Sequence, residues 1–286
     1  MKKVLIFGAD SYIGASFERY AQGRLDVTTV SSIGGEWKET DFSGYDSVVC
    51  VAGIAHRASK KENKELYFSV NRDLAVAAAQ KAKIEGARQF VYFSSMYAYG
   101  VRKGEISSVT TPAPSKGDSY GLSKYQAEML IEPMASEGFC VAIIRPPMVY
   151  GPECKGNFPL LVKIAKTVPF LPTLRNKRSM IYIDNLAEFL ALIIEQGSQG
   201  VFCPQNKDYV CTAKMMEEVA ISVGKTYRRL PLLNPFLSIL MPMFPPLQSA
   251  FGNLYYSAEA SKAPFSQDYQ IVGFEDGIKR SVTGNE

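Results

Sequence analysis

The sequence is poor in the residues that build metal and disulfide sites. Its 286 residues include one histidine, His56, and five cysteines with no Cys-x-x-Cys pair. A histidine-rich zinc site is therefore excluded, we predict no metal site, and only one catalytic triad could be built, around His56. The odd cysteine count favours reduced thiols and a cytoplasmic protein, because disulfides are rare in that compartment.

Net charge and long apolar runs are also scarce. The formal charge of +4 does not by itself predict nucleic acid or an anionic membrane as a partner. The apolar run at residues 4–7 is too short for a signal peptide and fits a first β-strand. The stretch Leu232–Leu247 contains four prolines and falls short of the roughly 20 residues of a membrane span, so we expect no transmembrane segment. A peripheral membrane contact there stays open, beside a helix and loop that cover the substrate cleft or a subunit interface.

Short apolar runs alternate with helical patterns through the first half of the chain. This alternation predicts an α/β fold with a parallel sheet and helices on both faces. We expect strands at Lys3–Phe7, Val27–Val30, Ser47–Val51, Gln89–Phe93 and Cys140–Ile144, and helices at Tyr12–Ala21, Lys64–Glu85 and about 120–137. After Arg145 prolines accumulate, and only Asn185–Glu195 and Ala213–Val223 give clear helical patterns. A smaller, less regular lobe is expected there.

Small residues mark the turn between the first strand and the first helix. Gly8, Ser11 and Gly14 recur at a spacing of three. Such a turn lets backbone N–H groups approach a pyrophosphate at the positive end of a helix, so it predicts a dinucleotide site. A tight turn without a ligand is the alternative. Ser11 stands where a second glycine is usual, so the loop is either wider there or lends a hydroxyl.

No carboxylate follows the second strand. An NAD site usually has an Asp or Glu there to hold the ribose 2′-hydroxyl. Here the residues are Val30-Ser31-Ser32-Ile33-Gly34, with neither an acid nor a base. Loss of the acid removes repulsion against a 2′-phosphate, and Ser31 and Ser32 could hydrogen-bond one. The sequence therefore favours NADP slightly over NAD as the cofactor.

Tyr120 and Lys124 form the central catalytic pattern. A spacing of four places both side chains on one helix face, where an ammonium lowers the pKa of a tyrosine from about 10. Such a tyrosine can act as acid and base in a hydroxyl–carbonyl interconversion, although an ordinary surface pair has the same spacing. Ser94-Ser95 ends the preceding strand, at the sheet edge where ligands bind in parallel folds.

Together these motifs resemble the extended short-chain dehydrogenase/reductase family, and within it the NAD-dependent epimerase/dehydratase group that acts on nucleotide sugars. The segments that carry the resemblance are Gly8–Gly14, Asp41-Phe42, Val51–Gly53, Val70-Asn71, Phe90–Gly100, Tyr120–Lys124, Arg145–Pro152 and Arg178–Asn185. The resemblance implies a Rossmann-type doubly wound sheet with a smaller, irregular C-terminal substrate lobe. We expect the nucleotide-binding part at 1–152 and 178–203, and the substrate lobe at 153–177 and 204–286.

The resemblance also implies a role for each matching residue. Tyr120 would be the acid/base, Lys124 would hold the nicotinamide ribose, and Ser95 would hydrogen-bond the reacting sugar oxygen. Asp41 and Phe42 would flank the adenine, and Asn71 would support the cofactor or the adjoining strand. Further cofactor contacts would come from Gly8, Ser11, Tyr12, Ile13, Gly14, Ser31, Ser32, Val51, Ala52, Gly53 and Pro147. The substrate would meet Met96, Met148, Asn157 and Arg178, whose guanidinium suits two phosphates.

One departure from the family narrows the reaction. Dehydratases of the family carry an Asp-Glu pair where this sequence has Met96 and Tyr97, so sugar 4,6-dehydration is not expected. We expect an NAD(P)-dependent nucleotide-sugar epimerase that acts at C4 through a 4-keto intermediate, with an NADPH-dependent 4-keto-sugar reductase as the alternative. A lipid-linked sugar substrate and an inactive cofactor-binding module are kept as further alternatives. His56 could reach the phosphates or be structural, and the two long helices could form a homodimer interface, as is common in the family.

Overall fold

A six-stranded parallel sheet forms the centre of the fold. The computed structural model describes residues 1–55 and 61–284. The strands are β1 (Lys3–Phe7), β2 (Asp26–Val30), β3 (Ser47–Cys50), β4 (Gln89–Phe93), β6 (Cys140–Ile144) and β10 (Gly200–Phe202), in the order β10-β6-β4-β3-β1-β2. Strands β3 and β4 are buried along their whole length, as unbroken apolar runs covered on both faces should be. The predicted α/β fold with a parallel sheet is confirmed.

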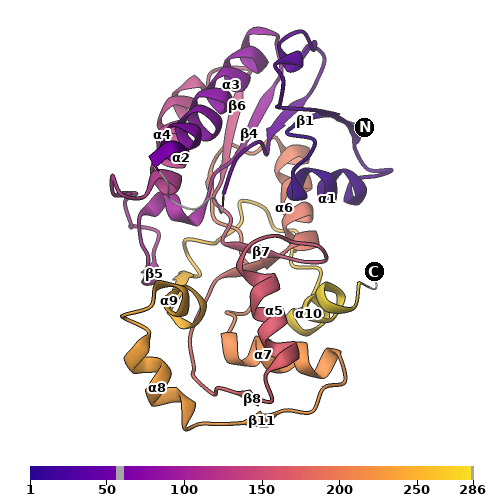
Figure 1. The fold of residues 1–286 in the computed structure, drawn as a ribbon. Helices are drawn as coiled ribbons and strands as arrows, with labels where there is room; N and C mark the ends of the chain where they lie inside the picture. Colours follow the sequence, from indigo (N-terminus) through magenta and orange to yellow (C-terminus); the bar gives the residue numbers. More distant parts are fainter. Residues whose placement is uncertain (56–60, 285–286) are drawn as a thin grey trace.

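Helices cover both faces of this sheet (Figure 1). On one face lie α1 (Tyr12–Tyr20) and α6 (Ile183–Gln196), which share a core with the sheet. On the other lie α3 (Ala75–Ile84) and α4 (Ser119–Ile131). The buried residues of α3 are four alanines at helical spacing, which let the helix approach the sheet closely.

Two predicted helices differ from the observed ones. The helix expected at Lys64–Glu85 consists of α2 (Lys61–Phe68), a π-helical segment η2 (Ser69–Leu74) and α3. Such π-helical turns often occur at functional sites, and this one carries the fully buried Asn71. The helix expected to reach residue 137 ends at Ile131, because Pro133 lacks the backbone N–H that the next helical turn requires.

A second core lies in the C-terminal lobe, the part below the main sheet in Figure 1. It is built by α5 (Asn157–Thr167), α7 (Thr212–Ser222) and α10 (Phe274–Thr283), with β7 (Met148–Tyr150) paired to β9 (Met180–Tyr182). The sequence does not predict α5 or α10. All strands of the main sheet lie in the predicted nucleotide-binding part, and the exact division into two parts stays a prediction.

All five cysteines are free thiols in the structure. In the described part of the chain, no helix is both long enough and apolar enough to cross a lipid bilayer.

Candidate active site

The turn after β1 brings the start of α1 close to the end of β3. Gly8 has a φ of +114°, and a Cβ there would lie 2.7 Å from the backbone nitrogen of Ala52, so only glycine fits. A Cβ on Gly14 would lie 3.1 Å from a methyl of Val51. The Ser11 Oγ accepts a hydrogen bond from Gly14 N at 2.9 Å and thereby caps α1. The Ser11 hydroxyl therefore fixes the helix start in a narrow loop.

The N-terminus of α1 is suited to an anion. Its first turn carries no acidic residue, so the partial positive charge of the helix is left unopposed. The Tyr12 hydroxyl is buried and has no hydrogen-bond partner among the described residues, and burial raises its pKa well above the ordinary value. A Cβ on Gly151 would lie 2.5 Å from this hydroxyl. The neighbouring Ile13 is half-buried and packs on both cores.

The residues expected around the adenosine do not all lie together. Ser31 and Ser32 follow β2 at the carboxyl edge of the sheet, and the Ser31 Oγ accepts a hydrogen bond from Ile33 N at 3.2 Å. Asp41 instead lines a depression of about 330 Å³ with Lys3 and Asp26, the first residues of β1 and β2. That is the opposite edge of the sheet. The structure therefore does not bring Asp41 together with the phosphate loop.

Hydrogen bonds explain where Asp41 and Phe42 sit. The Asp41 carboxylate accepts from the backbone N–H of Ser43 at 2.7 Å and from its hydroxyl at 2.9 Å, and these bonds lower the pKa of the carboxyl. The Phe42 ring is fully buried, 6.5 Å from the Phe7 ring centre, and the Phe42 N–H donates to Glu85 at 2.6 Å. Phe42 therefore belongs to the core, and its side chain is not available to an adenine.

The three predicted catalytic residues meet at the carboxyl end of β4. Ser95 follows that strand, and its Oγ accepts a hydrogen bond from Tyr97 N at 3.3 Å, which caps the short 3-10 helix η3 (Met96–Tyr99). The Ser95 side chain also lies near the Tyr120 phenol and acts to lower its pKa. The Lys124 Nζ donates to the carbonyl of Phe93, the last residue of β4, at 2.7 Å. All three residues therefore come from one face of α4 and from the end of strand β4.

Local interactions set the position of α4. Asp118 caps the helix by accepting a hydrogen bond from Gly121 N at 3.0 Å. A Cβ on Gly121 would collide with the carbonyl oxygen of Tyr97, so glycine lets the first turn of α4 lie directly against η3. Because Tyr120 lies in that turn and Ser95 caps η3, this close approach brings the two side chains together.

The pKa of Tyr120 moves opposite to the sequence prediction. Its pKa is raised to about 12, chiefly by burial, with smaller contributions from the nearby Tyr97, Asp118 and Tyr67, while the Ser95 side chain acts in the other direction. Lys124 does not lower it, since its amine points at the Phe93 carbonyl and lies 4.9 Å from the centre of the Tyr92 ring. Burial also lowers the pKa of Lys124 to about 8. The predicted lowering of the tyrosine pKa is therefore wrong for the protein by itself.

Asn71 joins the loop after β3 to α4. Its Oδ1 accepts from Ile54 N at 2.8 Å, and its Nδ2 donates to Ile54 O at 3.1 Å and to Ser123 Oγ at 3.2 Å. A Cβ on the adjacent Gly53 would lie 2.9 Å from the Lys124 Nζ. Of the two roles that the resemblance implies for Asn71, the geometry shows support of the adjoining segment. Val51 and Ala52 form the buried start of that segment.

Two aromatic residues that the sequence reasoning missed surround Tyr120. The rings of Tyr67 and Tyr97 lie 6.0 and 6.2 Å from the Tyr120 ring, both in edge-to-face arrangements. The Arg102 guanidinium stacks 4.5 Å from the centre of the Tyr97 ring and pairs with Asp118 at 2.5 Å. Only the position of Tyr97, two residues after Ser95, could have indicated its role.

Glu128 is a further missed residue, and a pattern for it exists. It lies one helical turn beyond Lys124, so Tyr120, Lys124 and Glu128 share one face of α4. Glu128 is buried and accepts from Arg145 Nε at 3.0 Å and from an Arg145 terminal nitrogen at 2.5 Å. This ion pair fastens α4 to the residue that follows β6.

The predicted substrate residues differ widely in exposure. Arg178 is 5% exposed, and one terminal nitrogen donates to Gly252 O at 3.0 Å. Its Nε has no partner and no carboxylate lies within ion-pair distance among residues 1–55 and 61–284, while burial lowers its pKa. Tyr97 lies close enough to both Arg178 and Tyr120 to influence the pKa of each.

The other predicted contacts are less clearly grouped. Met96 is buried in a small cluster with Tyr99 and Tyr256, whereas Asn157 is exposed at the start of α5. Pro147 is buried beside the half-buried Met148, which begins β7. His56 lies outside the described residues.

The sequence model of a known family covers most of this chain. The family described as "NAD dependent epimerase/dehydratase family" matches residues 4–211. This chain belongs to the NAD dependent epimerase/dehydratase family. The resemblance inferred from the motifs is confirmed, and the protein is an enzyme of the extended short-chain dehydrogenase/reductase type.

Individual relatives of this family member are epimerases and reductases. A UDP-glucose 4-epimerase from Vibrio cholerae is 29% identical over 262 residues, which cover 81% of this chain and 79% of that protein. A UDP-glucuronic acid 4-epimerase from Bacillus cereus, solved with NAD, is 17% identical with a TM-score of 0.73 and covers 98% of this chain and 95% of its own. A dTDP-4-dehydrorhamnose reductase from Bacillus anthracis, solved with NADP, is 16% identical with a TM-score of 0.72 over the full length of both chains. At these identities the two structures show the shared fold.

Proposed function

We propose that this enzyme is an NAD(P)-dependent nucleotide-sugar epimerase that acts at C4 through a 4-keto intermediate. The observation that carries the proposal is the meeting of Ser95, Tyr120 and Lys124 at the end of β4, near the buried Arg178, which has no carboxylate partner among the described residues. The set of Ser95, Tyr120 and Lys124 can move a proton to and from a hydroxyl oxygen. The arginine can bind an anion. A nucleotide sugar offers both, because its hydroxyls and its diphosphate lie at opposite ends of one molecule.

The residues present fit a nicotinamide dinucleotide. The close approach of Gly8 to Ala52, the unopposed N-terminus of α1 and the unpartnered Tyr12 hydroxyl suit a pyrophosphate. Residues 8–14 would hold that pyrophosphate and Lys124 the nicotinamide ribose. The cofactor would supply the acceptor and donor of a hydride. The NAD and NADP bound in the Bacillus structures support this class of cofactor.

Tyr120 moves the proton in this mechanism. It accepts the proton of the C4 hydroxyl when that carbon is oxidised and returns it when the ketone is reduced, so the enzyme is unchanged after one epimerisation. Ser95, whose side chain lies near the same phenol, would hold the sugar oxygen in line. Because burial keeps the pKa of Tyr120 at about 12, the phenolate needs a nearby positive charge. Lys124 does not supply this charge in the protein by itself, so the positively charged nicotinamide of the bound cofactor would have to bring it.

Arg178 is the candidate for the diphosphate. A guanidinium that is 5% exposed and meets only a carbonyl retains donors for a second ligand, and a planar fork of donors matches phosphate oxygens. Tyr97, which lies near both Arg178 and Tyr120, spans the distance between the diphosphate and the reacting hydroxyl.

The 4-keto-sugar reductase remains a second candidate because of two observations. A phenol with a pKa of about 12 is protonated at neutral pH, which is the form that a reductase needs to donate a proton to a ketone. No carboxylate follows β2, so a 2′-phosphate would not be repelled there. The reductase performs only the second half of the epimerase reaction and exchanges its NADPH after each turnover.

Mass spectrometry of the released cofactor separates the two candidates. The freshly purified protein is denatured, and the nicotinamide nucleotide in the supernatant is identified and quantified. Near-stoichiometric NAD supports the epimerase, whose cofactor need never leave. Empty protein that binds NADPH reversibly and reduces a 4-keto sugar supports the reductase. Protein that binds neither nucleotide contradicts both.

The substitution Tyr120→Phe tests the assignment of the proton carrier. We expect turnover to fall by about 10²–10⁴-fold, since general acid–base catalysis contributes that much, while cofactor binding is kept. Tyr125→Phe is the matched control, because Tyr125 lies on α4 but not on the Tyr120–Lys124 face. A Tyr120→Phe protein that turns over normally would refute the role.

A further inference from the structure

Helix α8 (Leu233–Leu240) displays an apolar stripe that the proposed function does not use. None of its residues is buried. Leu232, Phe236, Ile239 and Met243 are 81%, 61%, 70% and 70% exposed, at spacings of four, three and four residues. That spacing places them on one side of the helical segment. Such a row of large apolar side chains in solvent is unusual for a monomeric surface.

The stripe is held in place from the other side of α8. The Asn234 side chain accepts from Thr173 N at 3.0 Å and donates to Thr173 Oγ at 2.8 Å. Met241 packs partly against the core of the C-terminal lobe. The helix is therefore anchored to the protein by one face, and the exposed stripe is the opposite one.

The strand pair next to α8 extends this surface. Strand β8 (Phe170–Leu171) pairs with β11 (Arg228–Arg229), and Phe170, 45% exposed, lies opposite Arg228. A hydrogen bond from Leu230 N to Leu171 O at 2.9 Å continues the pair toward α8. Figure 1 shows α8, β8 and β11 at the end of the C-terminal lobe that lies farthest from the main sheet.

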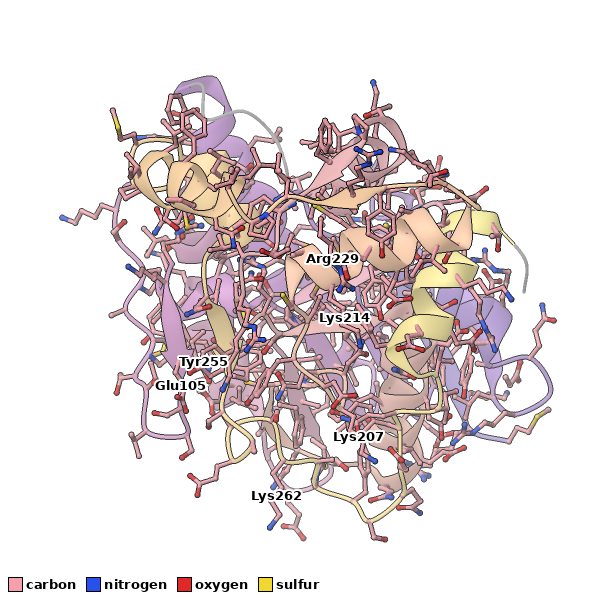
Figure 2. The ribbon with its side chains drawn as sticks, turned by 90° about the horizontal axis from the view of Figure 1, so that it is seen from below. Glu105, Lys207, Lys214, Arg229, Tyr255 and Lys262 are labelled. Carbon is pink, nitrogen blue, oxygen red and sulfur yellow. The ribbon has the colours of Figure 1, made fainter. Side chains whose placement is uncertain are left out.

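The same surface is cationic. The strand pair and α8, residues 170–171 and 228–240, contain two arginines and no Asp or Glu. Lys166 and Arg228 are exposed and have no ion-pair partner within the described ranges 1–55 and 61–284. Arg229 pairs with Glu217 at 2.7 Å, and Figure 2, which views the protein from this end, shows it against α7.

We propose that this surface, α8 with the β8–β11 pair, docks the enzyme on an anionic lipid bilayer. Apolar side chains at the helix face enter the boundary between headgroups and acyl chains, while the surrounding cations meet anionic headgroups. Since no described helix can cross a membrane, the contact is peripheral, with α8 lying in the plane of the surface. A second copy of the chain is a poorer occupant, because an isologous contact would set two cationic surfaces against each other.

Co-sedimentation of the full chain with vesicles tests the proposal. The vesicles are phosphatidylcholine, alone or with about one quarter phosphatidylglycerol, and the bound fraction is measured against lipid concentration and salt. We expect binding to the anionic vesicles that weakens with salt. The double substitution F236S/I239S should lower the partition coefficient by at least about tenfold, since two large apolar side chains no longer enter the lipid. R228Q/K166Q should lower it on anionic vesicles only.

The matched control is I84S/V109S, which removes two apolar side chains of 84% and 86% exposure outside this surface. It should bind lipid like the unchanged chain. Cofactor binding by every variant shows that the fold is kept, because α8 is remote from the phosphate loop. Three outcomes would overturn the proposal: no binding to anionic vesicles, equal binding by F236S/I239S, or a dimer in solution that F236S/I239S converts to monomer while lipid binding is absent.

Discussion

Two buried arginines of this protein differ in what neutralises them. Arg145, 7% exposed, is held by both carboxylate oxygens of Glu128. Arg178, 5% exposed, meets the carbonyl of Gly252 and no carboxylate in the described part of the chain. A buried charge without a counter-charge lowers the stability of the fold. We therefore expect Arg178 to destabilise the fold more than Arg145, whose charge Glu128 neutralises. The comparison shows that the structure neutralises Arg145 with a carboxylate and leaves Arg178 without one among the described residues, which is what the proposed binding of a substrate diphosphate requires.

The largest expected effect on stability comes from breaking the ion pair between Glu128 and Arg145. Glu128→Gln leaves the Arg145 guanidinium buried beside a neutral side chain, so we expect the free energy of unfolding to fall by about 3–5 kcal/mol. Urea denaturation at pH 7 measures the change. Glu132→Gln, at the exposed end of the same helix, is the control and should change the free energy by less than about 0.5 kcal/mol. If both variants lowered the free energy of unfolding by the same small amount, the claim that Glu128 neutralises a structural charge would be contradicted.

Arg178, in contrast, should contribute little to stability and much to substrate binding. Arg178→Met removes a cation whose burial disfavours its charge, and loses one bond to a carbonyl, so stability should change by no more than about 1 kcal/mol. Affinity for a nucleotide diphosphate should fall by about 10- to 100-fold, because charge-assisted hydrogen bonds are lost. Titration calorimetry with UDP measures it, with the exposed Lys177→Met as control. A strongly destabilised Arg178→Met protein with unchanged affinity would contradict the assignment.

Lys124 extends the comparison to the catalytic group, with a smaller expected effect on stability than that of breaking the Glu128–Arg145 ion pair. Its pKa is about 8 in the folded protein against 10.5 for an unperturbed lysine, because burial disfavours the charged form. Lys124→Met should therefore raise the free energy of unfolding at pH 7 by about 2 kcal/mol, after allowing for the lost bond to Phe93 O. Turnover should be lost at the same time.

The pH dependence gives the sign of this effect. Between pH 8 and 10.5 the unfolded chain binds more protons at Lys124 than the folded one, so the stability of the unchanged protein should rise over that window. The gain in stability of Lys124→Met over the unchanged protein should shrink across the same window and, above it, reverse by the cost of the lost bond to Phe93 O. The exposed Lys103→Met is the control and should follow the unchanged protein. A Lys124→Met protein that is less stable at pH 7 would show that burial does not penalise the ammonium.

Local patterns were enough to predict much of the fold and the centre of the site. The strands at Lys3–Phe7, Gln89–Phe93 and Cys140–Ile144 are observed with the predicted bounds, since continuous apolar runs between turn residues leave little choice. The spacing of Tyr120 and Lys124 predicted a shared helix face, and the residues after β4 predicted where that face points. Both inferences depend only on local sequence, within one helix and at the end of one strand.

Features that depend on distant partners could not be read from the sequence. The direction of the Lys124 amine is set by the Phe93 carbonyl, 31 residues away. Asp41 lies at the sheet edge opposite the phosphate loop because its surroundings come from the starts of β1 and β2. The missing counter-charge of Arg178 is a property of every element packed around it. In each case the deciding group has no fixed offset in the sequence.

The short strand pair β5 (Gly104–Ile106) and β12 (Leu254–Tyr256) has a consequence for how the enzyme matures. Strand β5 belongs to the segment between Ser95 and Tyr120, and the Tyr256 hydroxyl donates to the backbone of Arg145 at 2.8 Å. During synthesis the main sheet can assemble once residue 202 has emerged from the ribosome. Strand β5 cannot pair until β12 has been made, some fifty residues later. A nascent or truncated chain that ends before β12 would carry its nucleotide-binding sheet and lack a finished catalytic loop.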